Sequence, residues 1–118
     1  MSLDSMGDII AERALTLLED NGNSRQVFVR LGKPQSSPQG DEYHCPIQIV
    51  GIGGEKIRQI FGIDAFQALQ LTLRYISFSL HHYRKESNLI LYAWEQGDDM
   101  GFPEYPQDES LSSDPPVD

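Results

Sequence analysis

The sequence contains very little cysteine. Cys45 is the single cysteine among 118 residues, so no disulfide can form within the chain. This scarcity is typical of proteins that stay in a reducing compartment, and we expect a cytoplasmic protein. The apolar run LILYAW is far too short to cross a bilayer, and the N-terminal MSLDSMGDII lacks the basic and then apolar pattern of a signal peptide. We therefore expect no membrane partner.

Basic residues are also scarce. The chain has 9 basic and 18 acidic residues and a formal net charge of −9. Eight of the acidic residues lie between Glu95 and Asp118, a segment without Lys or Arg, so the rest of the chain is nearly neutral. Nucleic-acid binding proteins concentrate positive charge, and we expect no nucleic-acid partner. An acidic tail can attract a cationic protein, but a simply solvated tail is the more common case.

The length and composition predict one domain with extensions. We divide the chain into a flexible N-terminus (1–7), a single α+β domain (8–103) and an acidic, proline-rich tail (104–118). The part that follows Gly97 holds four of the seven prolines and little apolar material, so the tail is expected to be disordered.

Two strands are predicted near the N-terminus. In RQVFVRL (25–31), Val27, Val29 and Leu31 alternate with residues that point to the other face, as in a half-buried strand. Residues 9–19 fit a helix as well as a strand. We favour the strand, because it would pair with 25–31 across an Asn-Gly turn.

The next segments are assigned from breakers and alternation. GKPQSSPQGDE is predicted to be a loop, and YHCPIQIVGI (43–52) the third strand. Pro46 has no N–H to donate, so this strand should lie at an edge there or bend. GEKIRQIFG (54–62) is predicted to form one or two helical turns that end at Gly62, and NLILYAWE (88–95) is the fourth strand.

A long helix is predicted from Asp64 onward, with Asp64 and Gln67 at capping-box spacing. Its predicted apolar seam is Leu69, Leu73, Ile76, Leu80 and Tyr83, widened by Leu71, Tyr75 and Phe78. Its predicted polar stripe is Gln67, Gln70, Arg74, Ser77, His81 and Arg84. The apolar arc is wider than one sheet face requires, so the helix is either nearly enclosed or offers one flank to a partner.

The glycines in GIGGEKIR do not match a known phosphate-binding motif. The spacing and the missing hydroxyl residue exclude a P-loop, and Lys56 occupies the place of the last glycine of a dinucleotide-binding loop. The backbone N–H groups of Gly53 and Gly54 could hold an anion, but a tight turn out of the strand is the favoured interpretation.

No combination of residues predicts catalysis. His44 and Cys45 are adjacent in a strand and must point to opposite faces. His81 and His82 are adjacent in the helix, which is not a metal-ligand spacing. We expect no catalytic residue, no metal, no cofactor and no enzyme activity. The candidate interaction or pocket residues are Cys45, Gln67, Gln70, Arg74 and His82.

Four stretches carry a family resemblance: GKP, YHCPIQIVGIGG, GIDAFQALQLTL and AWEQGDDMGFP. The chain resembles an uncharacterised family of small bacterial proteins, a domain of unknown function. That family has a C-P-x-x-x-x-G strand and a G-x-D-x-x-Q-A-L-Q-L helix. The likeness covers about residues 7–103, supports the strand at 9–19 and implies no catalytic residues.

These observations predict an α+β fold: an antiparallel four-stranded meander (β-β-β-α-β) with the long helix packed across one face. The leading functional hypothesis is a non-enzymatic domain that acts through protein contacts. It would be immunity-like or antitoxin-like, or a homodimer through the helix, by analogy at the level of fold. The alternative is a small-molecule binder or small enzyme, with a pocket between the third strand and the helix near Cys45.

Overall fold

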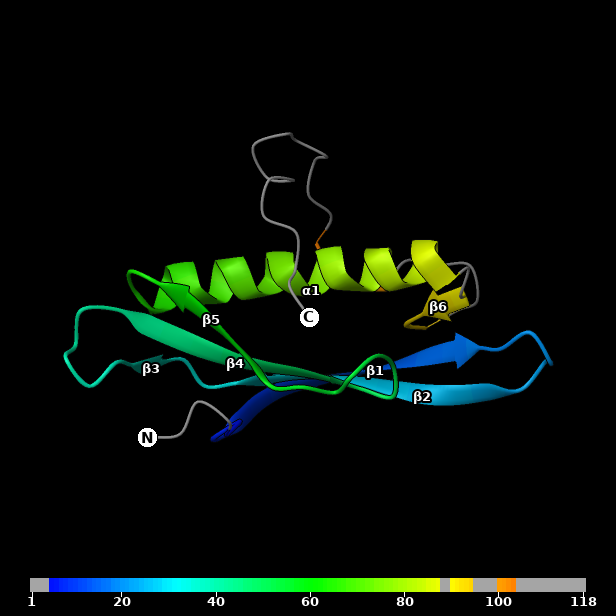
Figure 1. Ribbon diagram of the computed structural model, residues 1–118, viewed down its shortest axis with the longest axis horizontal. Coiled ribbons are helices and arrows are strands. Elements are labelled where there is room, and N and C mark those ends of the chain that lie inside the picture. Colours follow the sequence, from blue (N-terminus) through cyan, green and yellow to red (C-terminus); the bar gives the residue numbers. More distant parts are fainter. Residues whose placement is uncertain (1–4, 88–89, 95–99, 104–118) are drawn as a thin grey trace.

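The computed structural model describes residues 5–87, 90–94 and 100–103 (Figure 1). Its elements, in chain order, are β1 (Ile9–Leu18), β2 (Ser24–Gly32), β3 (Gln35–Ser36), β4 (Tyr43–Val50), β5 (Arg58–Gly62), α1 (Ala65–Ser87) and β6 (Ile90–Tyr92). The predicted α+β class is confirmed, with one long helix across one side of an antiparallel sheet. The described sheet has six strands rather than four, because β3 and β5 were not predicted.

All strand pairs are antiparallel, in the order β3-β4-β2-β1-β6, and β5 pairs with the other side of β4. The strand interpretation of residues 9–19 is confirmed, because β1 pairs with β2 from Leu18 opposite Ser24 onward. Alternation explains this choice over a helix: Leu15 and Leu17 are buried beneath α1, while Ala14, which points to the other face of β1, is exposed.

β4 is not an edge strand, since it has neighbours on both sides. Pro46 pairs with Gln59 of β5 on one side. On the other side, pairing with β2 ends at Ile47 opposite Leu31 and resumes only at His44, with β3. The residue without an N–H therefore lies where the ladder toward β2 and β3 is interrupted, which is how a proline is accommodated inside a sheet.

The predicted helical turns at 54–62 are wrong. Residues 54–57 lie in a turn and an irregular loop, and the following five residues form β5, with Ile60 opposite Cys45 of β4. Gly62 is not a helix stop. A Cβ there would lie 2.5 Å from the backbone nitrogen of Ala68, so the glycine lets α1 begin close against the end of β5.

The helix begins as predicted, with Asp64 as its N-cap. The Gln67 N–H donates to the Asp64 carboxylate over 2.8 Å, and the Ile63 N–H donates to the Gln67 side-chain oxygen over 2.8 Å. The first bond satisfies one of the donors that an uncapped helix start leaves open, and the second ties the residue before the cap to the first turn. They also fix the direction in which the chain leaves β5.

The buried face of α1 differs from the predicted seam. Ile76 and Leu80 are buried as predicted, but the fully buried first half of the face is formed by Ala68 and Thr72. Ser77, assigned to the polar stripe, is also buried. Small side chains face the sheet because the helix approaches it closely, and a pattern based on large apolar residues does not detect them.

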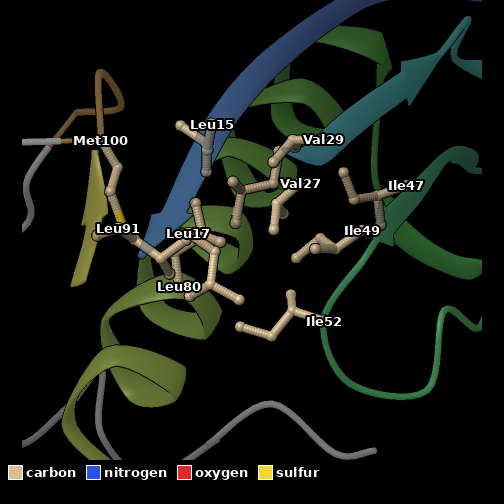
Figure 2. Close-up of a cluster of buried hydrophobic side chains, with 11 residues drawn as sticks. Leu15, Leu17, Val27, Val29, Ile47, Ile49, Ile52, Leu80, Leu91 and Met100 are labelled. Carbon is tan, nitrogen blue, oxygen red and sulfur yellow. The ribbon is translucent and has the colours of Figure 1, made fainter. Parts of the chain in front are cut away.

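The core lies between α1 and the sheet and draws on every large element (Figure 2). Its buried members are Leu15, Leu17, Val27, Val29, Ile47, Ile49, Ile52, Ile76, Leu80, Leu91 and Met100. Burying one such side chain contributes about 1.5–3 kcal/mol. Leu91 and Met100 therefore attach the segment after the helix to the rest of the domain.

The predicted terminal extensions are described only in part. The tail at 104–118 lies outside the described residues. In the N-terminal segment, the carbonyl of Ser5 accepts a hydrogen bond from the Gln59 side chain of β5 over 3.3 Å. Among the described residues, no helix has the length and apolarity that a bilayer-spanning segment needs.

Candidate functional site

Cys45 is enclosed between β4 and α1. Its Sγ donates to the carbonyl of Gly32 over 3.4 Å. Burial raises the pKa of the Cys45 thiol, and a hydrogen bond with Thr72 acts in the opposite direction. A buried thiol held in its protonated form is a poor nucleophile, so Cys45 has the character of a core residue.

The other candidate residues do not gather around Cys45. The side chain of Gln67 caps the helix start, and Gln70 and His82 are exposed. Arg74 is half-buried at mid-helix. His82 lies ten residues beyond Thr72, about 15 Å along the helix. The structure thus keeps Cys45 and His82 apart, and the five residues form no single site.

The side chain of His44 lies on the opposite face of β4 from Cys45. Its Nδ1 lies 2.8 Å from the side-chain oxygen of Gln59, and its ring lies 5.7 Å from that of Phe61. The side chains of His44 and Cys45 therefore lie on different sides of the sheet. Within the described parts of the chain, no three His, Cys, Asp or Glu residues are placed to share a metal ion.

A pocket of about 320 Å³ lies between β4, the segment that leads into β5, and α1. Its lining residues are Ile47, Ile49, Gly53, Gly54, Glu55, Lys56, Arg58, Tyr75, Ser79 and Tyr83. The pocket is between the strand and the helix named in the alternative hypothesis. Residues further along β4 line it, however, and Cys45 does not.

The pocket has an apolar wall and an aromatic wall. Ile47 and Ile49 are buried side chains of β4, and Tyr75 and Tyr83 of α1 are half-buried. Ser79 lies between the two tyrosines on the helix, four residues from each. A serine at a position that faces the sheet leaves room that a larger side chain would fill, and this small residue contributes to the hollow.

Ser79 also brings a polar group into this space. Its side chain is 6% exposed, and its Oγ has no hydrogen-bond partner among the residues that the structure describes. Leaving a buried hydroxyl unsatisfied costs about 1–3 kcal/mol. A molecule that occupies the pocket can offer the missing partner.

The opening of the pocket is positively charged. Lys56 is exposed and Arg58 is half-buried, and both line the pocket. Among the described lining residues the single acidic one is Glu55, whose carboxylate accepts a hydrogen bond from the Gly51 N–H over 3.0 Å. The described lining thus holds two cations and one carboxylate, in a chain that is nearly neutral outside the acidic segment 95–118.

The loop at the opening is held in a fixed shape. Glu55 has a φ of 57°, which is rare for a residue with a side chain. It is secured at two points, because its carboxylate binds Gly51 and its carbonyl accepts from the Gln48 side chain over 3.0 Å. Gly53 has a φ of 69°, and a Cβ there would lie 2.4 Å from the Tyr83 hydroxyl. Strain of this kind is maintained where a site is preorganised.

Residues 11–104 match the family model Domain of unknown function (DUF6968). The chain belongs to this family. No curated protein and no solved structure matches the chain significantly. The expected membership in an uncharacterised domain family is thus confirmed, and the matched region contains every residue that lines the pocket.

The sequence of this DUF6968 chain indicated the glycine-rich turn, but not the segments of β4 and α1 that form a pocket with it. The turn does not begin a helix; it lines a pocket whose other walls come from β4 and α1. One sequence signal was available: Tyr75, Ser79 and Tyr83 recur at helical spacing on the face that meets the sheet. A small polar residue between two aromatic residues there is unusual for a core.

Proposed function

We propose that this DUF6968 protein is a non-catalytic binding domain that takes a small ligand into the pocket between β4 and α1. The observation that carries the proposal is the buried Ser79 Oγ, which has no partner among the described residues. Buried hydroxyls are almost always hydrogen-bonded, and exceptions need an explanation. A concave, mostly apolar space with a few converging polar groups is the usual form of a ligand site.

A binding role fits the lining better than catalysis. A serine nucleophile needs a base within hydrogen-bond reach, and Ser79 has none among the described residues. The Glu55 carboxylate is bound to a backbone N–H, and Cys45 is outside the lining. These features support recognition of a molecule without its conversion.

The proposal is tested by titrating benzyl alcohol, benzoate and phenyl phosphate into isotope-labelled protein and following backbone amide shifts by NMR. We expect shifts confined to residues 47–58 and 75–83. Ser79→Leu, which fills the hollow, should abolish them, whereas Gln70→Leu, which introduces the same residue at an exposed helix position, should not. The proposal is wrong if none of the probes shifts these amides, or if Ser79→Leu leaves the shifts intact in a folded protein.

A second candidate function is contact with another protein. Phe61, Ile63 and Phe66 are 43%, 76% and 78% exposed at the junction of β5 and α1. Large apolar side chains that gather on a surface mark interaction sites. Among the large apolar residues described on α1, Phe66 alone is exposed, so the wide apolar arc supports such a contact only at the helix start.

For this candidate we take a second copy of the chain as the partner. Sedimentation velocity over a range of concentrations should then show a dimer that Phe66→Ser weakens. Ile90→Ser, a change of an exposed apolar residue in β6, which follows the far end of α1, should leave the dimer intact. A wild-type protein that remains monomeric at every concentration would remove self-association as a function of this surface.

A further inference from the structure

We infer that the ligand of this pocket is a small organic anion: a carboxylate or phosphate group carried on an apolar or aromatic body. This inference rests on the proposed binding function and names the chemical class of the ligand. It is drawn from the distribution of charge, backbone and apolar surface around the pocket.

The anionic group belongs at the opening, beside Lys56 and Arg58. Both residues line the pocket, and Glu55, the one acidic residue among its described lining residues, accepts a hydrogen bond from the Gly51 N–H through its carboxylate. Most of the formal net charge of −9 comes from the acidic segment 95–118, and the rest of the chain is nearly neutral, so two cations at one concave opening can attract an anion locally. Arginine and lysine are the side chains that bind carboxylate and phosphate groups most strongly.

The backbone at the opening is accessible to the same group. Gly54 lines the pocket, and nothing lies within 4 Å of the position that a Cβ would occupy there. Gly53 and Glu55, on either side, both have positive φ values. Gly54, between them, does not have a positive φ, and a turn in which the backbone angles alternate in this way can expose successive peptide N–H groups to a bound anion.

An inorganic anion would not fill this space. The pocket of about 320 Å³ reaches the lower limit of sites that hold drug-sized molecules. Beyond the charged opening it is bounded by Ile47, Ile49, Tyr75 and Tyr83, which offer apolar and aromatic contact. The body of the ligand therefore lies against these walls, with a polar atom within reach of the unpartnered Ser79 Oγ.

The experiment compares four probes by NMR titration of the full-length protein: phenyl phosphate, benzoate, benzyl alcohol and inorganic phosphate. We expect phenyl phosphate or benzoate to bind about tenfold or more tightly than benzyl alcohol, the effect of one charge-assisted contact. Inorganic phosphate, which lacks the body, should bind more weakly than phenyl phosphate. Raising NaCl from about 50 mM to about 300 mM should weaken the anionic probes selectively.

Lys56→Gln and Arg58→Gln are the decisive variants. Each should weaken phenyl phosphate and benzoate about tenfold and leave benzyl alcohol unchanged. Lys85→Gln removes the same charge from an exposed position near the end of α1, and should have no effect. Arg58 belongs to β5, so Arg58→Gln could weaken binding by disturbing this strand. Lys56 lies in the exposed loop before β5, and the effect of Lys56→Gln does not depend on the stability of the strand.

The outcomes separate the two proposals. If benzyl alcohol binds as tightly as phenyl phosphate and Lys56→Gln changes the affinity of neither probe, the inference of an anionic ligand is wrong, while the proposed binding function stands. If inorganic phosphate binds as tightly as phenyl phosphate, the apolar body is wrong. If no probe perturbs residues 47–58 and 75–83, the binding function itself fails. A preference between phenyl phosphate and benzoate identifies the anionic group.

Discussion

Burial of the Ser79 side chain lowers the stability of the fold, because no hydrogen bond within the described residues compensates for the lost hydration of its hydroxyl. Its Oγ is unpartnered, whereas the hydroxyl of Thr72, on the same helix face, donates to the Ala68 carbonyl over 2.7 Å. Of these two buried hydroxyls on one helix face, one is satisfied and the other has no partner among the described residues. Such a difference is typical of residues retained for binding rather than for stability.

We predict opposite effects of deleting these two hydroxyls. Ser79→Ala should raise the free energy of unfolding by about 1 kcal/mol, since the desolvation cost disappears and alanine favours the helix. Thr72→Val should lower it by about 1 kcal/mol, because a buried hydrogen bond is lost. Urea denaturation of the ligand-free variants measures both. A Ser79→Ala variant that is destabilised as much as Thr72→Val would show that the Ser79 hydroxyl has a partner.

Cys45 makes the stability depend on pH in the alkaline range. Burial raises the pKa of its thiol above the ordinary value of 9.0, so the folded protein holds this proton more tightly than the unfolded chain. The resulting stabilisation is complete below pH 9 and is lost as the pH rises through the pKa of the folded state.

We therefore predict that the stability difference between the wild type and Cys45→Ala shrinks as the pH rises. Denaturation curves at about pH 7 and about pH 10 measure it, and groups present in both proteins cancel in the difference. The neutral thiol should also react slowly with a thiol reagent until the protein unfolds. A constant stability difference, or rapid labelling of the native protein, would contradict this account.

At the scale of elements, the loop between β4 and β5 determines the shape of the pocket opening. Its conformation depends on three contacts at one end of the pocket: the Glu55 bonds to Gly51 and Gln48, and the close approach of the Tyr83 hydroxyl to Gly53. The loop and the last turns of α1 are therefore fixed relative to each other. A side chain at position 53 would separate them.

Three glycine variants measure this arrangement. Gly53→Ala should destabilise the protein by about 1–3 kcal/mol, because it combines a strained φ with a collision against Tyr83. Gly40 also has a positive φ but has open space around it, so the loss of stability in Gly40→Ala should report the backbone strain alone. Gly54→Ala has neither, and should change the stability by less than about 0.5 kcal/mol. Thermal unfolding of the three gives the order, and equal losses would exclude the Tyr83 contact.

At the scale of the whole molecule, Arg13 joins the two ends of the described domain. From β1 its guanidinium lies 5.2 Å from the ring of Trp94 and 4.7 Å from that of Phe102, and it donates to the Gly101 carbonyl. Met100, beside these residues in the chain, is buried in the core. The described residues after β6 are thus part of the folded body.

This arrangement predicts cooperative unfolding of both ends. Trp94 is the single tryptophan, so its fluorescence reports on this segment while far-UV circular dichroism reports on the helix and sheet. The two urea transitions should coincide. Arg13→Ala should lower the midpoint by the equivalent of about 1–3 kcal/mol, whereas Arg25→Ala, which removes only a surface ion pair with Glu19, should change it little. A tryptophan transition that precedes the loss of circular dichroism would show that the segment folds separately.

Local patterns in the sequence determined the long strands and the helix. Alternation placed Val27 and Val29 on one face of the second strand, and the spacing of Asp64 and Gln67 located the start of α1. These signals succeed because each depends on neighbours within a few residues. The motif at the start of the helix likewise indicated an uncharacterised domain family, which the DUF6968 match bears out.

Only the tertiary structure decided the identity of β5 and the existence of the pocket. Residues 58–62 form a strand because β4 offers them an unpaired edge, which no local pattern in that segment reveals. The pocket arises because a small residue, Ser79, faces a strand more than twenty positions away and a loop that Glu55 holds open. The space left by a side chain depends on what it packs against, and that depends on how distant segments meet in the folded chain.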